Sequence, residues 1–435
     1  MTSQPVELSR RRFLVGAGTS AAGALALPSL WPRYAFATPG QPATGDALVV
    51  VFLRGGADGL SLVPPFSDTT GYQALRGAGT ANSVAVAAPN ASNPAAALDL
   101  QATLSGHSFG LHPAMSGLKG VWDAGDLAII HAAGMPSSES SSRSHFEATD
   151  YWERGSASLS VTNGWLARYL TSAGIGGALP AIAYDSAVPM SLRGNKGSMA
   201  MNSVESFNVE GFWDAGLGND ALSHVYTTGT VDPLVQQGAD TLAAVALVEA
   251  ENPLQYDTHA ALYPADGPGQ WLGQGLREVA CLLRSDVGLR IACVDLSGWD
   301  HHDSMGSPAG GLTAAFAGGL SDALAAFHQD LGSLMNEVTV VTMSEFGRTI
   351  GLNGSGGTDH GRGSAVFVMG GSVNGGLYGN YPSGPLDDGP EGDLEVQNDF
   401  RRPLAEVVTK RLGNATLSQV FPGYAHAGDL GLCTT

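Results

Sequence analysis

The chain has 435 residues, of which 43% are hydrophobic and 14% charged, and its 21 Lys and Arg against 40 Asp and Glu give a formal net charge of −19. This length and apolar content exclude a disordered chain and fit one large domain or two medium ones. So acidic a surface repels phosphate backbones, which argues against nucleic-acid binding through a basic face. Only 3 cysteines are present, too few for a disulfide framework in a chain of this length.

The first residues have the pattern of an export signal. Residues 9–14 read Ser-Arg-Arg-Arg-Phe-Leu, a close match to the twin-arginine motif, and a weakly apolar stretch rich in Gly and Ala follows over residues 15–27. That stretch is too short for a membrane span, and the Ala-Phe-Ala at 35–37 offers the small residues that a signal peptidase reads. We therefore predict a twin-arginine signal peptide over residues 1–37 and a single domain over residues 38–435. The Tat translocase is then the partner during export. The mature chain has no membrane span and works in the periplasm or outside the cell.

Short β-branched runs alternate with stretches of helical period along the rest of the chain. The runs are almost continuously apolar, as expected for strands covered on both faces, and the alternation predicts an α/β fold with a mostly parallel sheet and helices on both sides. Residues 187–237 break the pattern, which indicates a loop or cap insertion, and residues 77–110 and 370–399 have the composition of long surface loops. The expected strands are 47–53, 127–132, 181–184, 289–296, 338–343 and 365–369, and the expected helices are 112–124, 144–154, 163–173, 238–251, 269–285, 312–334 and 400–412.

Polar residues follow the first two of these strands. Asp58 stands in the Gly-rich turn after the first strand, where it is either a ligand or a turn or helix-capping residue. Arg143, Ser144 and His145 follow the second strand, at the start of a helix. Ser144 is there either a helix cap or a nucleophile that faces the amides of the helix N-terminus. Arg143 and His145 beside it suit the handling of an anion.

The later strand ends carry a larger set of polar side chains. Crowded carboxylates and imidazoles are costly unless a cation neutralises them, so this set predicts a divalent-metal site. Mixed imidazole and carboxylate ligands admit Zn, Mn, Mg, Ca or Fe. An arginine in the set would neutralise the negative charge on the non-bridging oxygens of an anionic substrate. The set comprises Asp300 and His302 after the run 289–296, Glu345 and Arg348 after the run 338–343, and Asp359 and His360 before the run 365–369.

The motif order GGADGL, SRSHF, GWDHH, SEFGRT and TDHG, behind a twin-arginine signal, resembles the family catalogued as domain of unknown function 1501. The resemblance covers nearly the whole chain. That family is similar, at a distance, to the alkaline phosphatase and sulfatase superfamily. The resemblance implies an α/β core with a metal site at the strand ends, Ser144 as the nucleophile, and His145 or Asp359 as supporting or proton-transfer groups. It implies as metal ligands Asp58, Asp300, His302, Glu345 and His360.

The chain departs from the superfamily pattern at two of these positions. Four residues separate Asp58 from its strand, and Glu345-Phe346 stands where an Asp-His pair is usual. No cysteine, and no serine near Arg143, has the spacing to Pro and Arg that formylglycine formation needs. Conventional sulfatase chemistry is therefore not expected.

These observations favour an exported metal-dependent hydrolase of small phosphate esters, and less so of sulfate esters, that uses Ser144 or a metal-bound water. Two alternatives stay open. One is a non-catalytic exported envelope protein that keeps the fold and a structural metal. The other is a serine esterase that uses Ser108, because residues 106–110 read Gly-His-Ser-Phe-Gly and fit the G-x-S-x-G elbow of α/β-hydrolases.

Overall fold

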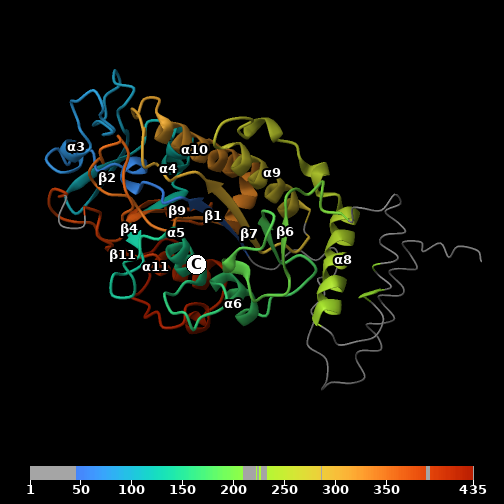
Figure 1. Ribbon diagram of the computed structural model, residues 1–435. Helices are drawn as coiled ribbons and strands as arrows, with labels where there is room; N and C mark the ends of the chain where they lie inside the picture. The colour runs from blue at the N-terminus through green and yellow to red at the C-terminus, as the bar shows by residue number, and fades with distance from the viewer. Residues whose placement is uncertain are drawn as a thin grey trace, which may run out of the picture. The chain divides into compact units, whose positions relative to one another are not determined.

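A mixed sheet runs through the centre of the protein (Figure 1). The computed structural model describes residues 46–208, 222, 225–226, 233–285, 287–387 and 392–434, so the predicted signal peptide lies outside the described residues. Within them, nine strands form one sheet in the order β10-β4-β9-β8-β1-β7-β5-β6, with β11 also paired to β4. The strands are β1 (Ala47–Arg54), β4 (Leu127–Gly134), β5 (Ala181–Tyr184), β6 (Ser198–Met201), β7 (Ile291–Ser297), β8 (Val338–Met343), β9 (Ser364–Met369), β10 (Gly376–Tyr378) and β11 (Asn398–Asp399).

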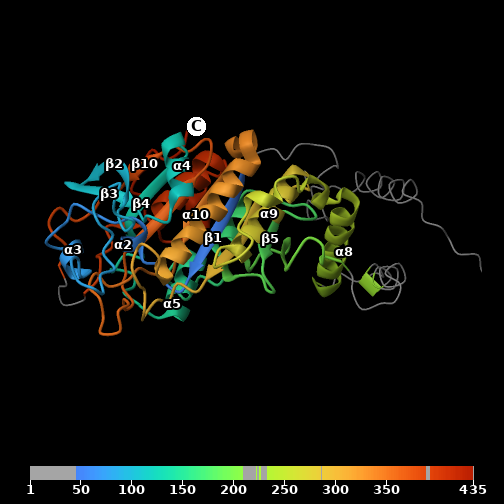
Figure 2. The same cartoon turned by 90° about the horizontal axis from the view of Figure 1, so that it is seen from above.

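Helices cover both faces of this sheet, because its strands are apolar on both sides. Val49 and Val51 of β1 pack into one hydrophobic core with α4, α9 and α10, whereas Val50 and Phe52 pack into a second core with α5, α6 and α11. Figure 2 shows α4, α9 and α10 lying together over one face. The predicted α/β fold with a mostly parallel sheet is thereby confirmed. The helices are α2 (Gly59–Leu62), α3 (Tyr72–Leu75), α4 (Ser116–Ala124), α5 (His145–Arg154), α6 (Trp165–Ser172), α8 (Pro233–Glu251), α9 (Gln270–Arg284), α10 (Leu312–Leu331), α11 (Arg401–Glu406) and α12 (Leu417–Val420).

One strand of the sheet runs against the others. β9 is antiparallel to both of its neighbours, β4 and β8, whereas the remaining pairs are parallel. Its first residue, Ser364, lies opposite Ala133 near the end of β4. The loop before β9 is therefore at the same edge as the carboxyl ends of β1, β4, β7 and β8, which is the edge where ligands bind in open α/β sheets.

Five strands lie in segments that the sequence indicated as surface loops or an insertion. β2 (Leu98–Leu104) and β3 (His107–Leu111) form a separate antiparallel hairpin, β6 lies in the insertion segment and pairs with β5, and β10 and β11 lie in the segment 370–399 and pair with β4. Ser108 lies within β3, opposite Thr103. The esterase hypothesis is wrong, because a nucleophile elbow requires a strand that turns directly into a helix.

The remaining sequence features concern the cysteines and the membrane. Cys281, Cys293 and Cys433 are all buried and free. Among the helices of the described residues, none is long and apolar enough to cross a membrane.

Candidate metal centre

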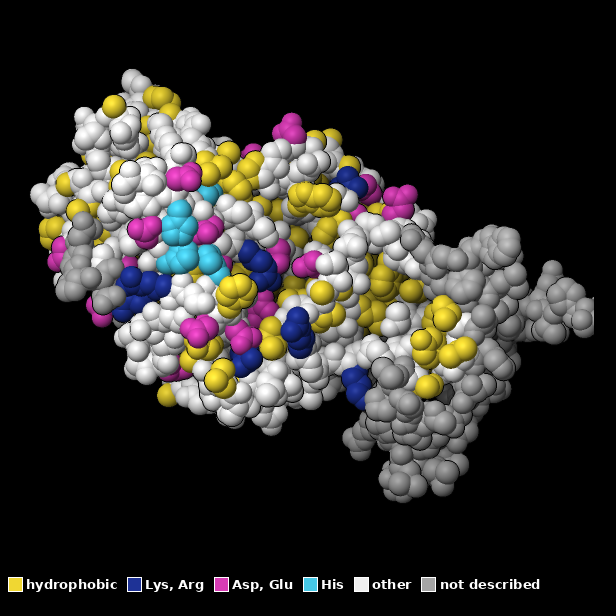
Figure 3. Space-filling model, in the orientation of Figure 1, with side chains coloured by type: hydrophobic (Ala, Val, Ile, Leu, Met, Phe, Trp, Pro, Cys, Tyr) yellow, Lys and Arg dark blue, Asp and Glu magenta, His cyan; other side chains and the backbone are white. Residues whose placement is uncertain are grey.

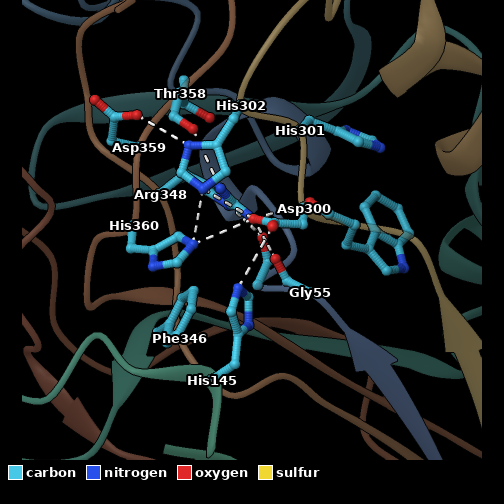
Figure 4. A network of polar contacts seen from close by, with 12 residues as sticks. Gly55, His145, Asp300, His301, His302, Phe346, Arg348, Thr358, Asp359 and His360 are labelled. Carbon is cyan, nitrogen blue, oxygen red and sulfur yellow. Dashed lines mark hydrogen bonds and ion pairs between the residues drawn. The ribbon is translucent and has the colours of Figure 1, made fainter.

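The loops at the carboxyl edge of the sheet are held together by one buried arginine. The Arg348 guanidinium lies among three loops, those after β1 and β7 and the one before β9 (Figure 4). Gly55 allows the loops after β1 and β7 to approach each other closely. Its φ is +114°, and a Cβ at this position would lie only 2.6 Å from the backbone nitrogen of Asp300. Arg348 donates hydrogen bonds to the carboxylate of Asp300 and to the carbonyl oxygens of Gly55, Gly56, Trp299 and Thr358.

Four side chains point toward one another at this edge (Figure 4), namely Asp300 and His302 from the loop after β7, His360 from the loop before β9 and His145 from the start of α5. Oδ1 of Asp300 lies 3.1 Å from Nε2 of His302 and 3.2 Å from Nε2 of His360, and Oδ2 lies 3.5 Å from Nε2 of His145. The two Nε2 atoms of His302 and His360 are 2.9 Å apart. A tetrahedral site with metal–ligand bonds of about 2.0 Å has ligand atoms about 3.3 Å apart. The separations among Asp300, His302 and His360 are therefore close to those of ligands on a single ion, and among the described residues Nε2 of His145 is grouped with Asp300 and His360, with all ligand atoms within 4.8 Å of one another.

The outer ring nitrogen of each histidine is bound to an oxygen acceptor. An acceptor at Nδ1 places the ring proton there and leaves a lone pair on Nε2. Two such lone pairs at 2.9 Å repel each other unless a proton or a metal ion lies between them. The residues present thus fit a divalent metal ion. The acceptors are Glu345 Oε1 for His145 at 3.0 Å, Asp359 Oδ1 for His302 at 2.9 Å, and the carbonyl oxygen of Arg143 for His360 at 2.8 Å.

The charge state of the cluster also suits a cation. Burial disfavours the ionised form of Asp300, but the hydrogen bond and charge of Arg348 outweigh burial and lower the pKa of this carboxyl to about 2. Burial lowers the pKa of His360, so this imidazole is neutral at pH 7. An ionised carboxylate and a neutral imidazole are the forms that bind metals.

The cluster is open to solvent. The side chains of Asp300 and His302 are 45% and 41% exposed. On the face shown in Figure 3, the histidines form one patch with acidic and basic side chains around it. A substrate can therefore approach the centre from outside.

The structure changes the roles of three predicted residues. His145, predicted as a catalytic group, points its Nε2 at the centre and joins Asp300 and His360 among the atoms that could hold a metal. Glu345 and Asp359, predicted as ligands, instead bind the outer nitrogens of two of the histidines. One oxygen of each carboxylate accepts the Nδ1 proton of a histidine, an arrangement that would orient that histidine toward a metal.

Asp58 takes no part in this cluster. Its carboxylate is buried, with Oδ2 2.5 Å from Nη1 of Arg76 and Oδ1 3.1 Å from Nη2 of the same residue. It also accepts from the backbone nitrogens of Leu60 and Ser61 and so caps α2. Burial opposes its ionisation, but Arg76 outweighs burial and lowers the pKa of Asp58. The prediction of a metal ligand is corrected to an ion pair and helix cap, because both oxygens are in use.

The residues predicted to act on substrate lie in three different settings. Ser144 is exposed at the start of α5, and its side chain makes no capping bond to the helix. Arg143 forms an ion pair with Asp393 at 3.0 Å, beside the cluster. Arg348 is buried and bonded to loop carbonyls and Asp300, so it positions the loops and does not face a substrate as predicted.

Phe346 is a site residue that the sequence analysis did not identify. Its ring lies 5.0 Å from that of His145 and 4.6 Å from that of His360, measured between centroids. An aromatic residue after a buried strand is normally part of the core, so only its place next to Glu345 in the sequence pointed to the site. His301, the neighbour of His302 in the sequence, is buried and points away from the cluster, with Nδ1 3.2 Å from Thr313 Oγ1 (Figure 4).

The fold and the cluster define an α/β protein with a candidate metal centre at the carboxyl edge of its sheet. The family model described as "Protein of unknown function (DUF1501)" matches residues 46–388, and the chain belongs to this family. The resemblance based on the motifs is thus confirmed. Comparison with curated proteins gave no match. Among solved structures, the chain is similar to the lipoteichoic acid synthase LtaP from Listeria monocytogenes, at 10% sequence identity, with 82% of this chain and 76% of that chain covered and a TM-score of 0.31.

Proposed function

We propose that this protein is an exported hydrolase of phosphate esters that binds a divalent metal ion at His145, Asp300, His302 and His360. One observation carries the proposal: ligand atoms of His145, Asp300 and His360 lie within 4.8 Å of one another, Nε2 of His302 lies beside two of them, and each outer ring nitrogen is held by an acceptor. Three imidazoles with one carboxylate favour Zn or Fe over Mg and Ca, which prefer oxygen ligands. The twin-arginine signal, the boundary at residue 37 and the distant relation to the alkaline phosphatase superfamily stay predictions.

The chain's own groups supply the rest of the chemistry. A bound divalent ion would act as a Lewis acid toward a phosphoryl oxygen. Ser144 stands beside the ligand His145 at the N-cap of α5. The first amides of a helix bind anions, so α5 can hold a non-bridging oxygen. In one turnover, the P–O bond to the alcohol breaks and a P–O bond to a water oxygen forms, directly or through phosphorylated Ser144. The leaving alcohol takes one proton from that water.

Elemental analysis of the mature protein tests the metal, and hydrolysis of aryl phosphates, phosphodiesters and aryl sulfates with and without chelator tests the activity. We expect about one equivalent of metal and a phosphatase activity that the chelator removes. Asp300→Asn should lose metal and activity, whereas Ser144→Ala should keep the metal and lose activity. Asp126→Asn is the matched control. Asp126 also pairs with a histidine, with its Oδ2 2.8 Å from Nε2 of His328, but neither residue belongs to the cluster. A wild-type protein that binds no divalent metal would refute the proposal.

A non-catalytic protein with a structural metal is the second candidate. The observation in its favour concerns Ser144, whose hydroxyl makes no hydrogen bond to a base among the described residues. This candidate predicts that chelation lowers the free energy of unfolding while no ester of the panel is hydrolysed.

A further inference from the structure

We propose that Phe346 is a positioning residue of the metal centre, whose ring holds the imidazoles of His145 and His360 in the orientation that a bound ion requires. The inference rests on the proposed function, because it concerns the same centre. Phe346 has no ligand atom of its own. It follows Glu345 directly, in the loop after β8, and is only 2% exposed.

The rings of Phe346, His145 and His360 pack against one another (Figure 4). The centroid of the phenyl ring lies 5.0 Å from that of His145 and 4.6 Å from that of His360, and the two imidazole centroids are 4.4 Å apart. The planes of the two imidazoles are tilted by 45° and 37° to the phenyl plane. Tilted rings at about 4.5–7 Å form attractive aromatic pairs. One phenyl ring thus contacts two proposed ligands, which come from α5 and from the loop before β9.

The phenyl ring also packs on the loop after β1. Gly56 in this loop has a φ of +76°, and a Cβ at this position would lie 2.6 Å from Cδ2 of Phe346. A glycine is therefore needed for the ring to lie here. The carbonyl oxygen of Gly56 accepts a hydrogen bond of 2.7 Å from Nε of Arg348, which holds the loops together. The ring thus rests on a loop whose position Arg348 fixes, and it can impose that position on the imidazoles.

The hydrogen bonds at Nδ1 do not fix the two imidazoles completely. Glu345 accepts from Nδ1 of His145 at 3.0 Å, and the carbonyl oxygen of Arg143 accepts from Nδ1 of His360 at 2.8 Å. Such a bond selects the tautomer, but the ring can still tilt about it, and a tilt displaces Nε2. Contact with Phe346 restricts the tilt, because an imidazole that turned toward the phenyl ring would overlap with it. Glu345 and Phe346 therefore set the tautomer and the ring plane of the same ligand.

Cobalt substitution of the mature protein tests this role. The visible absorption of bound Co²⁺ depends on the geometry of its ligands, so at saturation it reports the geometry independently of the affinity. The Kd for Zn²⁺ is measured alongside. Phe346→Leu should weaken Zn²⁺ binding by about tenfold and change the position and intensity of the Co²⁺ bands, because the imidazoles can then tilt. Phe346→Tyr keeps the ring and should retain the wild-type spectrum.

Phe327→Leu is the matched control. Phe327 is also a fully buried phenylalanine, but it lies on α10, in the core that packs against the other elements of that face of the sheet. Its replacement should lower the stability and leave the Co²⁺ spectrum unchanged. If Phe346→Leu does not fold, Phe346→Met takes its place. Methionine nearly conserves the buried volume, but its flexible side chain cannot hold a ring plane, so the spectrum should change in the same way.

The outcomes separate this inference from the proposed function. If the wild-type protein binds the metal and the folded Leu or Met variant keeps the wild-type Co²⁺ spectrum, whatever its Kd, the ring only fills space. The inference is then overturned, while the proposed function stands. A Phe346→Tyr spectrum altered as much as that of Phe346→Leu also overturns it, because the ring would not be the deciding feature. If the wild-type protein binds neither Co²⁺ nor Zn²⁺, the proposed function fails and this inference fails with it.

Discussion

Replacement of Glu345 shows whether this carboxylate orients a metal ligand or is one itself. Glu345 is 4% exposed, and its Oε1 accepts hydrogen bonds from Nδ1 of His145 at 3.0 Å and from the backbone nitrogen of Gly55 at 2.6 Å. Groups that orient a ligand typically contribute 10- to 100-fold to metal affinity, or about 1.4 to 2.7 kcal/mol. Glu345→Gln keeps an acceptor for both donors and removes only the charge, so we expect a loss of about tenfold. Glu345→Ala also removes the acceptor, so we expect about 100-fold.

The Kd for Zn²⁺, measured by competition with a chromogenic chelator, is the assay, and circular dichroism confirms that each variant folds. Glu147→Gln is the control, because this carboxylate is exposed on α5, the helix that begins at His145, and among the described residues it accepts a hydrogen bond from Ser142 at 2.6 Å. It should leave the Kd unchanged. The reasoning is refuted if Glu345→Ala keeps the wild-type affinity. It is also refuted if Glu345→Gln loses as much affinity as Asp300→Asn, because Glu345 would then be a ligand.

Three further predictions concern stability. Arg348→Lys should lower the free energy of unfolding, measured in urea, by at least about 3 kcal/mol, because an ammonium cannot reach the several loop carbonyls that the guanidinium binds. An unchanged urea concentration at the midpoint of unfolding would contradict this prediction. Asp58→Asn leaves Arg76 buried without its charge partner, so it should lower the free energy of unfolding by about 3–5 kcal/mol. Elemental analysis should find the metal content unchanged, and loss of metal from the folded variant would restore Asp58 as a ligand. Burial lowers the pKa of His131 to about 4, below the unfolded value of about 6.5, so the unfolded chain binds the extra proton. Stability should therefore fall as the pH drops from about 6.5 to about 4, by up to about 1.4 kcal/mol per pH unit from this residue, and His131→Gln should reduce that slope.

The fold class could be read from the sequence because buried strands have an unmistakable composition. Residues 181–184 and 338–343 form strands with the predicted bounds, since every residue of these short runs had to be compatible with burial. The direction of β9 could not be read in the same way. An antiparallel strand that is buried on both faces has the same apolar composition as a parallel one, and only its pairing with β4 and β8 distinguishes the two.

For the site, the sequence by itself determined the candidate residues. Asp300, His302 and His360 stood out because imidazoles and carboxylates next to buried strands are rare in a chain with 14% charged residues. The tertiary structure alone decided which groups face the centre. His145 and Glu345 lie 200 positions apart, and only the meeting of two loops makes one a candidate ligand and the other its hydrogen-bond acceptor. Asp58 was misassigned for the same physical reason: the role of a carboxylate depends on the cation nearest to it in space, and that cation is Arg76.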